Sequence, residues 1–211
     1  MSSKKLVIID YKMGNLGSVY NAFRFLKHNV EISDSPQKLM DCDGMVLPGV
    51  GAFGDAMKNL NRSSLADTIR SEIKKGKPYL GICLGYQMLF ESSEEDRDIK
   101  GLGVLKGGVV RFRTDNLKVP HIGWNQIKIQ KESMILKEIG DNSYLYFVHS
   151  YYPDPEDEDL ALTRTEYGES FVSAVAKDNI FAFQFHPEKS QESGLKILKN
   201  FGDMCVHHTG H

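Results

Sequence analysis

At residues 78–90 the chain reads Pro78-Tyr79-Leu80-Gly81-Ile82-Cys83-Leu84-Gly85-Tyr86-Gln87-Met88-Leu89-Phe90, and the fold is organised around this segment. The apolar run after the proline is typical of a buried strand, and the run from Tyr86 to Phe90 is compatible with a helix. Small residues two before and two after Cys83 allow a sharp turn from strand to helix, which holds the side chain clear of the backbone. A helix that begins directly after Cys83 directs its free N–H groups at the sulfur and favours the thiolate.

The same segment is also compatible with a buried structural cysteine, a common state of free cysteine. Glycines on both sides of a cysteine recur by chance in unrelated sequences. The rest of the chain must therefore decide between a reactive and a structural Cys83.

Length and composition are those of an α/β domain with an ample core, since the chain has 211 residues, of which 41% are hydrophobic. We expect residues 1–211 to form a single domain, with a frayed tail at 206–211. The net charge of −2, with both signs mixed, gives no reason to expect nucleic acid or an anionic membrane as a partner. Because no apolar run approaches the length of a membrane span and no signal-peptide pattern is present, we expect a soluble, cytoplasmic protein.

The cysteines point to a free thiol rather than to a disulfide framework or a metal site. Cys42, Cys83 and Cys205 are odd in number and widely spaced, and they contain no Cys-x-x-Cys pair. We therefore expect no bound metal and no cofactor.

Strand-like and helix-like runs alternate through the first half of the chain. This alternation predicts a three-layer α/β fold of the flavodoxin-like kind, with a mostly parallel central sheet and helices on both faces. Ligands then bind beyond the carboxyl ends of the strands. The expected strands are residues 6–10, 30–32, 44–47 and the strand before Cys83, and the expected helices are 15–28 and 65–73.

The second half predicts shorter, additional antiparallel strands and a closing helix. A charged run at 91–98 and an acidic run at 153–159 are expected to be solvated surface connections. The strands are expected at 109–112, 126–130, 144–148, 160–165, 171–176 and 180–185, and the amphipathic helix at 190–204.

Three further segments place reactive or backbone-exposing residues directly after a predicted strand. The glycine-rich run at 48–54 leaves the backbone free to approach a ligand, although an ordinary tight turn has the same pattern. His186 is followed two residues later by Glu188, a carboxylate that can fix the tautomer and orientation of a catalytic base. The alternative is a surface histidine beside a helix-capping serine. For His149 we favour a hydrogen-bonded histidine among core aromatic rings over a catalytic role.

Together these residues supply the components of acyl transfer. Cys83 is the candidate nucleophile, His186 the candidate base, and Glu188 the group that orients the base. The candidate oxyanion donors are backbone groups at strand ends, namely those of Gly49, Val50, Gly51 and Leu84.

These motifs resemble those of class I (triad-type) glutamine amidotransferases. More narrowly, they resemble the glutaminase subunits of imidazole glycerol phosphate synthase, an enzyme of histidine biosynthesis. The resemblance spans nearly the whole chain in order, and it implies the fold of that class. The narrower resemblance rests on Asp10-Tyr11, Met13-Gly14-Asn15-Leu16, Gly49-Val50-Gly51-Ala52-Phe53, Pro120-His121-Ile122-Gly123-Trp124-Asn125, Phe147-Val148-His149-Ser150-Tyr151 and Phe185-His186-Pro187-Glu188-Lys189-Ser190.

The resemblance implies a role for each matched residue. Cys83 would attack the side-chain amide of glutamine to form a γ-glutamyl thioester, His186 would pass a proton to the departing ammonia, and Glu188 would hold His186. Water would then release glutamate. The peptide groups of Gly49, Val50, Gly51 and Leu84 would stabilise the oxyanion, and Gln87, Ser150 and Tyr151 would bind the polar groups of glutamine.

The resemblance also implies a heterodimer with a (β/α)8-barrel cyclase subunit of the HisF type. Ammonia would pass through a channel to the barrel, which forms imidazole glycerol phosphate and an aminoimidazole carboxamide ribotide. Asn15, Trp124 and Lys189 are implied to face this partner. The glycines beside Val50 would let its peptide reorient when the acceptor site is loaded. Lys12 departs from the family, which usually has glycine there, in a loop expected at the partner face.

Other interpretations stay open from the sequence. A paralogous ammonia-donating subunit for a different acceptor, such as a nucleotide sugar, would have the same active-site residues. A stand-alone cysteine hydrolase of the same fold often lacks the segments at 48–51 and 120–125, which are present here. The retained triad disfavours a binding or scaffold protein that has lost catalysis. A flavodoxin-like nucleotide binder is disfavoured because no glycine-rich phosphate loop follows the first strand.

Overall fold

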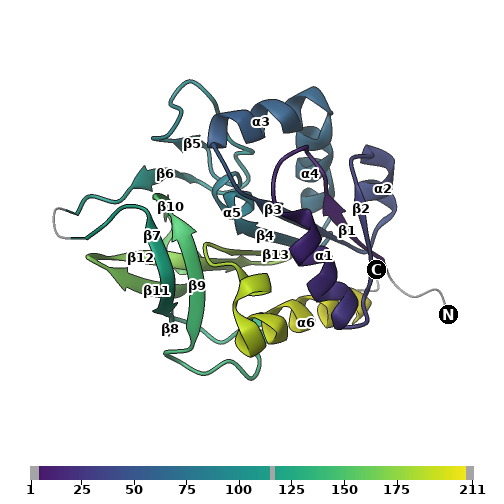
Figure 1. Cartoon of the computed structure of the whole chain (residues 1–211). Helices are drawn as coiled ribbons and strands as arrows, with labels where there is room; N and C mark the ends of the chain where they lie inside the picture. Colours follow the sequence, from purple (N-terminus) through teal and green to yellow (C-terminus); the bar gives the residue numbers. More distant parts are fainter. Residues whose placement is uncertain (1–4, 115–116, 208–211) are drawn as a thin grey trace.

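The computed structural model describes residues 5–114 and 117–207, and it is built around an eight-stranded sheet (Figure 1). The strand order is β2-β1-β3-β4-β13-β12-β11-β8. Neighbours from β2 to β13 pair in parallel, and those from β13 to β8 pair antiparallel, which confirms the predicted mostly parallel sheet with additional antiparallel strands. The strands are β1 (Lys5–Ile9), β2 (Asn29–Ser33), β3 (Gly44–Gly49), β4 (Tyr79–Cys83), β8 (Lys128–Ile129), β11 (Ala161–Tyr167), β12 (Glu169–Lys177) and β13 (Ile180–Phe183).

Helices cover both faces of this sheet, which gives the three layers predicted (Figure 1). On β1, Val7 and Ile9 pack into one core and Leu6 and Ile8 into the other, because successive side chains of a strand point to opposite faces. All four are buried, as expected for a strand covered on both sides. One face carries α2 (Pro36–Asp41), α3 (Phe53–Arg62) and α4 (Leu65–Lys74), and the other carries α1 (Leu16–Phe25) and α6 (Gln191–His207).

The helices differ in part from those expected. α1, α4 and α6 were predicted, whereas α2 and α3 were not. α6 continues to His207, so the first two residues of the expected tail are helical, and residues 208–211 lie outside the described part of the chain. No helix in the described ranges has both the length and the apolar character needed to cross a membrane.

Two small sheets form beside the main one and correct two of the predicted boundaries. The strand expected at 126–130 is divided between β7 and β8 at the buried Ile127. The first residues of the connection expected at 153–159 belong to β10, where Pro153 and Pro155 are tolerated because β10 is an edge strand. One sheet contains β10 (Tyr151–Pro155), β6 (Gly107–Arg111) and β5 (Ser92–Ser93), and the other contains β7 (His121–Gln126) and β9 (Tyr144–His149).

The charged run at 91–98 is largely exposed, as expected, but it is not a free loop. Its carboxylates accept hydrogen bonds from distant backbone groups: Glu94 from the N–H of Arg111 at 3.0 Å, and Glu95 from the N–H of Phe53 at 2.8 Å. Ser93, within β5, is buried. These bonds hold the run against β6 and the first turn of α3.

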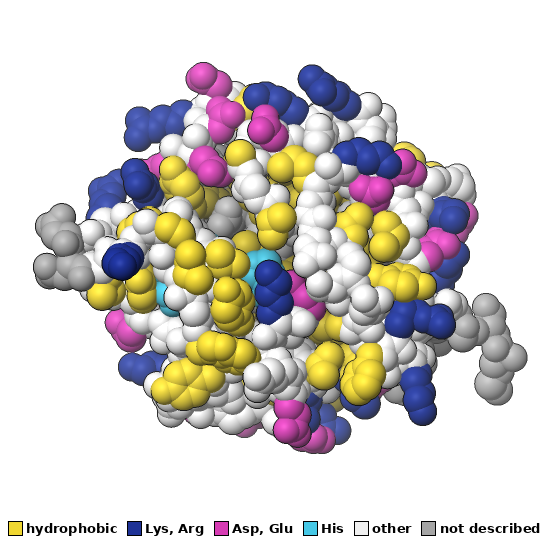
Figure 2. Space-filling view, viewed as in Figure 1, with side chains coloured by type: hydrophobic (Ala, Val, Ile, Leu, Met, Phe, Trp, Pro, Cys, Tyr) yellow, Lys and Arg dark blue, Asp and Glu magenta, His cyan; other side chains and the backbone are white. Residues whose placement is uncertain are grey.

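The face of the β7–β9 sheet that points away from the core is apolar and open. Ile122 and Trp124 on β7 are 59% and 45% exposed, and Tyr144 on β9 is 57% exposed. Figure 2 shows hydrophobic side chains gathered over these two strands. We call Ile122, Trp124 and Tyr144, with Tyr146, which pairs with Trp124, the β7–β9 face.

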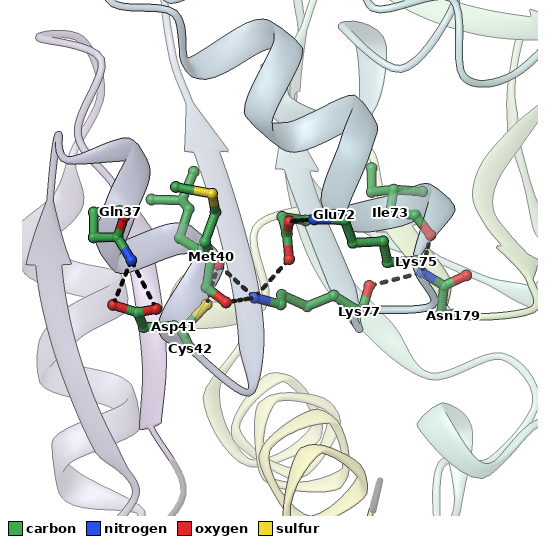
Figure 3. A network of polar contacts seen from close by, with 10 residues as sticks. Gln37, Met40, Asp41, Cys42, Glu72, Ile73, Lys75, Lys77 and Asn179 are labelled. Atoms are coloured by element: carbon green, nitrogen blue, oxygen red, sulfur yellow. Dashed lines mark hydrogen bonds and ion pairs between the residues drawn. The ribbon is translucent and has the colours of Figure 1, made fainter. Parts of the chain in front are cut away.

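An ionic network around the buried Glu72 connects α2 and α4, which cover the same face of the eight-stranded sheet (Figure 3). The Lys77 ammonium donates to the carbonyls of Leu39 and Met40 at the end of α2, each at 2.6 Å, and lies 2.9 Å from the carboxylate of Glu72 in α4. Glu72, whose side chain is only 5% exposed, has a second partner in Lys75 at 2.7 Å. Lys77 therefore donates to the carbonyl groups at the end of α2 and also neutralises the buried carboxylate of Glu72.

Candidate active site

Cys83 lies at the predicted turn from β4 to a helix, α5 (Leu84–Gln87), although this helix ends at Gln87 and does not continue to Phe90. Its φ of +54° is in the left-handed region, a strained conformation that recurs at functional sites. Gly85 is needed because a Cβ there would lie 1.7 Å from the carbonyl oxygen of Leu47 in β3. Gly81 is needed because its Cβ would lie 2.8 Å from the carbonyl oxygen of Gly85. The turn can therefore pack against β3 only with these small residues.

His186 and Glu188 form a buried pair just beyond the end of β13, the strand that lies beside β4. The Nδ1 atom of His186 is 2.8 Å from Oε1 of Glu188, and both side chains are 3% exposed. Burial lowers the pKa of His186, but the negative charges of Cys83 and Glu188 outweigh it and raise the pKa to about 10. Nε2 makes no hydrogen bond to a described residue, so it is available to the neighbouring sulfur or to a substrate.

A cavity of about 230 Å³ opens beside the sulfur. Cys83 is thus buried but not sealed in the interior, because its side chain lines this cavity. Gly49 does not line it, although Gly49 pairs in register with Cys83. The predicted residues that do line it are Val50, Gly51, Cys83, Leu84, Gln87, Ser150 and Tyr151, and they are joined by Glu95 and Val148.

Two amide side chains link the cavity-lining Gln87 to the sulfur. Nε2 of Gln87 donates to the carbonyl of Tyr151 at 3.0 Å and to Oε1 of Gln184 at 3.2 Å. Nε2 of Gln184 then donates to the sulfur of Cys83 at 3.6 Å. The sulfur is also 4.0 Å from the carbonyl oxygen of Val148.

His149 has the structural role favoured from the sequence. Its Nδ1 donates to the carbonyl of Tyr151 at 2.9 Å, so its Nε2 accepts from Nδ1 of His121 at 3.0 Å. The ring is buried among aromatic side chains that include Phe112 and Phe171. Burial lowers the pKa of His149 to about 3 and that of His121 to about 4, which keeps both rings neutral.

Comparison with known proteins decides the family. Residues 7–205 match the family described as glutamine amidotransferase class-I. The imidazole glycerol phosphate synthase subunit HisH of Aquifex aeolicus is 54% identical over 198 residues, which cover 93% of this chain and 95% of the relative. The HisH subunit of Methanocaldococcus jannaschii is 51% identical over 93% of this chain and 98% of its own.

The chain belongs to the HisH family of class-I glutamine amidotransferases. It is therefore an enzyme of the glutamine amidotransferase class, and the expectation of an imidazole glycerol phosphate synthase glutaminase subunit is confirmed.

Solved structures share the fold at much lower identity. The PurLQS structure from Thermotoga maritima has a TM-score of 0.75 at 18% identity, and covers 96% of this chain and 99% of its own. A glutamine amidotransferase from the same organism has a TM-score of 0.71 at 18% identity, with 98% and 100% covered. At this identity the likeness shows the fold alone.

Lys12 stands where the family usually has glycine. The backbone conformation at this position explains why glycine is usual there. Lys12 has a φ of +66°, where glycine is favoured. Its ammonium lies 3.1 Å from Asp10 and 2.8 Å from Asp34, and its N–H donates to Asp10 at 2.8 Å. These exposed contacts hold the lysine in the conformation that glycine adopts more easily.

The three residues expected to face a partner lie outside the cavity. Trp124 belongs to the β7–β9 face, and the Lys189 ammonium lies 5.8 Å from the centre of the Tyr146 ring on the same sheet. Asn15 caps α1 by accepting from the N–H of Ser18 at 3.4 Å. Their role toward a partner stays a prediction.

Two residues at the site were missed from the sequence. Gln184 stands between Phe183 and Phe185 and is fully buried, and a polar residue inside an apolar run just before His186 was the available signal. Glu95 carried no such signal, because it is one of several acidic residues in a charged run. Among the described residues, no three histidine, cysteine, aspartate or glutamate side chains are arranged to hold a metal ion.

Proposed function

We propose that this chain hydrolyses glutamine through a thioester on Cys83 and delivers the ammonia to a separate cyclase subunit that makes imidazole glycerol phosphate. The observation that carries the proposal is a strained, cavity-lining cysteine beside a buried His186–Glu188 pair. This is the arrangement of nucleophile, base and orienting carboxylate that acyl transfer requires.

In the first step the Cys83 thiolate attacks the side-chain carbonyl carbon of glutamine. The C–S bond forms, and the carbonyl oxygen becomes an oxyanion held by N–H groups of the Gly49-Val50-Gly51 segment and of Leu84. His186, protonated because its pKa is raised, gives its Nε2 proton to the leaving nitrogen, and ammonia departs as the C–N bond breaks.

In the second step the neutral His186 takes a proton from water, whose oxygen attacks the thioester carbon. The C–S bond breaks, and glutamate and the Cys83 thiolate are released. Glu188 stabilises the imidazolium form of His186 and holds Nδ1, so Nε2 faces the reaction in both steps.

The cavity also suggests how glutamine is recognised. Both amide hydrogens of Gln87 are engaged, by Tyr151 and Gln184, so its Oε1 is left to accept from an N–H of the substrate. Among the residues lining the cavity Glu95 is the carboxylate, and we assign it to the α-ammonium group. The backbone of Ser150 and Tyr151 then holds the remaining polar groups.

The partner is proposed to dock on the β7–β9 face. Exposed apolar patches of this kind mark interaction sites, and Figure 2 shows hydrophobic side chains around the centre of this side of the molecule, where a histidine is visible. Trp124, Lys189 and Asn15 are assigned to the interface. A (β/α)8-barrel cyclase docked here would receive ammonia before it is protonated or lost.

We also propose that residues 1–211 form one domain and that the protein acts in the cytoplasm.

The test is Cys83→Ala in the complex with a barrel cyclase. We expect glutamine-dependent synthesis to be lost and synthesis from added ammonium salt to be retained. Cys42→Ala is the matched control, because Cys42 is also buried but its sulfur bonds to the carbonyl of Leu39. Glutamine-dependent synthesis that survives in Cys83→Ala would remove Cys83 as the nucleophile.

A further inference from the structure

We infer that Gln184 is a positioning residue that holds an amide donor against the sulfur of Cys83. The inference rests on the proposed function of Cys83 as nucleophile and adds a residue to that site.

Gln184 lies directly after β13, between two buried phenylalanines. It is 0% exposed, its neighbours Phe183 and Phe185 are equally buried, and its backbone N–H donates to the carbonyl of Ser173 at 2.9 Å. An uncharged apolar residue would pack here without any polar partner. A buried amide is tolerated only when its oxygen and nitrogen are both hydrogen-bonded, so the partners of Gln184 explain its presence.

The orientation of the Gln184 amide follows from the hydrogen bonds around it. The carbonyl of Tyr151 can only accept, so the Gln87 atom 3.0 Å from it is the nitrogen. The same nitrogen is 3.2 Å from Gln184, which must therefore present its oxygen. The NH₂ group of Gln184 is then left to face the sulfur of Cys83, at 3.6 Å.

This amide acts on one protonation state of the sulfur. An N–H donor stabilises a thiolate more than a neutral thiol, because hydrogen bonds to charged groups are the stronger ones. The carbonyl of Val148, 4.0 Å from the sulfur, can only accept and so favours the S–H form. The NH₂ group of Gln184 opposes that preference, because it can only donate to the sulfur.

The experiment measures alkylation of Cys83 by iodoacetamide against pH in the complex with a barrel cyclase, with the modified cysteine identified by peptide mass mapping. Gln184→Met and Gln184→Leu both remove the N–H donor, but the two side chains differ in shape. If one variant does not fold, the other is sufficient for the test. We expect the midpoint of the alkylation profile to move up by about one pH unit, and the rate at any pH below both midpoints to fall about tenfold. The kcat for glutamine should fall, with KM changed much less.

Ser173→Ala is the matched control. Ser173 is also 0% exposed, and its side chain hydrogen-bonds to Thr163 and Thr165 and not to the sulfur, so the substitution removes buried hydrogen bonds without removing the donor. Its alkylation profile should match that of the unaltered chain. A folded Gln184 variant with an unchanged midpoint and rate would overturn the inference. Alkylation does not require glutamine turnover, so this result is separate from a failure of the proposed function, which Cys83→Ala reports.

Discussion

Replacing Glu188 with glutamine should separate catalysis from folding at this site. The two side chains have the same shape, and the amide oxygen of glutamine can still accept from Nδ1 of His186, so the ring keeps its place. What is lost is the negative charge 2.8 Å from the imidazole. Oε2 of Glu188 is buried without a partner, and the NH₂ group that replaces it is left unpaired as well, so the loss of charge is the main change.

The size of the effect follows from the geometry. Two unit charges at this separation attract by about 6 kcal/mol at an effective dielectric constant of about 20. Desolvation of the pair offsets part of this, and breaking a buried pair costs about 3–5 kcal/mol. We take about 4 kcal/mol, within this range, as the stabilisation of the imidazolium form by the charge of Glu188. Its loss should lower kcat for glutamine about a thousandfold. The pKa of His186 should also fall, since the charge of Glu188 is one cause of its elevation.

The assay is steady-state glutamine hydrolysis by the complex with a barrel cyclase. Synthesis from ammonium salt by the same complex is the control, and urea denaturation checks folding. The raised pKa of His186 contributes stability that is fully present below its unfolded value and is lost as pH rises toward about 10. Any loss of unfolding free energy in Glu188→Gln should therefore shrink in alkaline buffer. A folded variant with kcat within tenfold of the unaltered enzyme would refute the charge argument.

Three further predictions concern the scaffold. Gly85→Ala places a Cβ 1.7 Å from the carbonyl oxygen of Leu47, so we expect about 3 kcal/mol or more of destabilisation in urea denaturation, and a variant as stable as the original would contradict that contact. Lys77→Met leaves the buried Glu72 with one partner (Figure 3), so stability should fall by about 3 kcal/mol with kcat unchanged, and equal stability would show that the network is dispensable. Burial lowers the pKa of His149 to about 3, so stability should fall as pH drops below about 6.5, where the unfolded chain binds the proton and the folded chain does not. His149→Gln should flatten this slope, and an unchanged slope would assign it to other groups.

The parallel half of the fold and the catalytic residues were accessible from the sequence for local reasons. β3 and β4 are buried on both faces, so they appear as apolar runs, and the turn at Cys83 requires glycines at fixed spacing. His186 and Glu188 are two residues apart, so their pairing could be predicted without knowing what surrounds them.

The chain alone determined which residues can react and where strands and helices alternate, because those properties depend on neighbours a few positions away. Only the tertiary structure showed that Glu95, within the charged run, lines the cavity and that Gln184 hydrogen-bonds to the sulfur of Cys83. Their partners, Phe53 and Cys83, are 42 and 101 residues distant along the chain. A hydrogen bond over such a separation forms only when the sheet has brought the two segments together, and nothing in the local pattern of either segment encodes it.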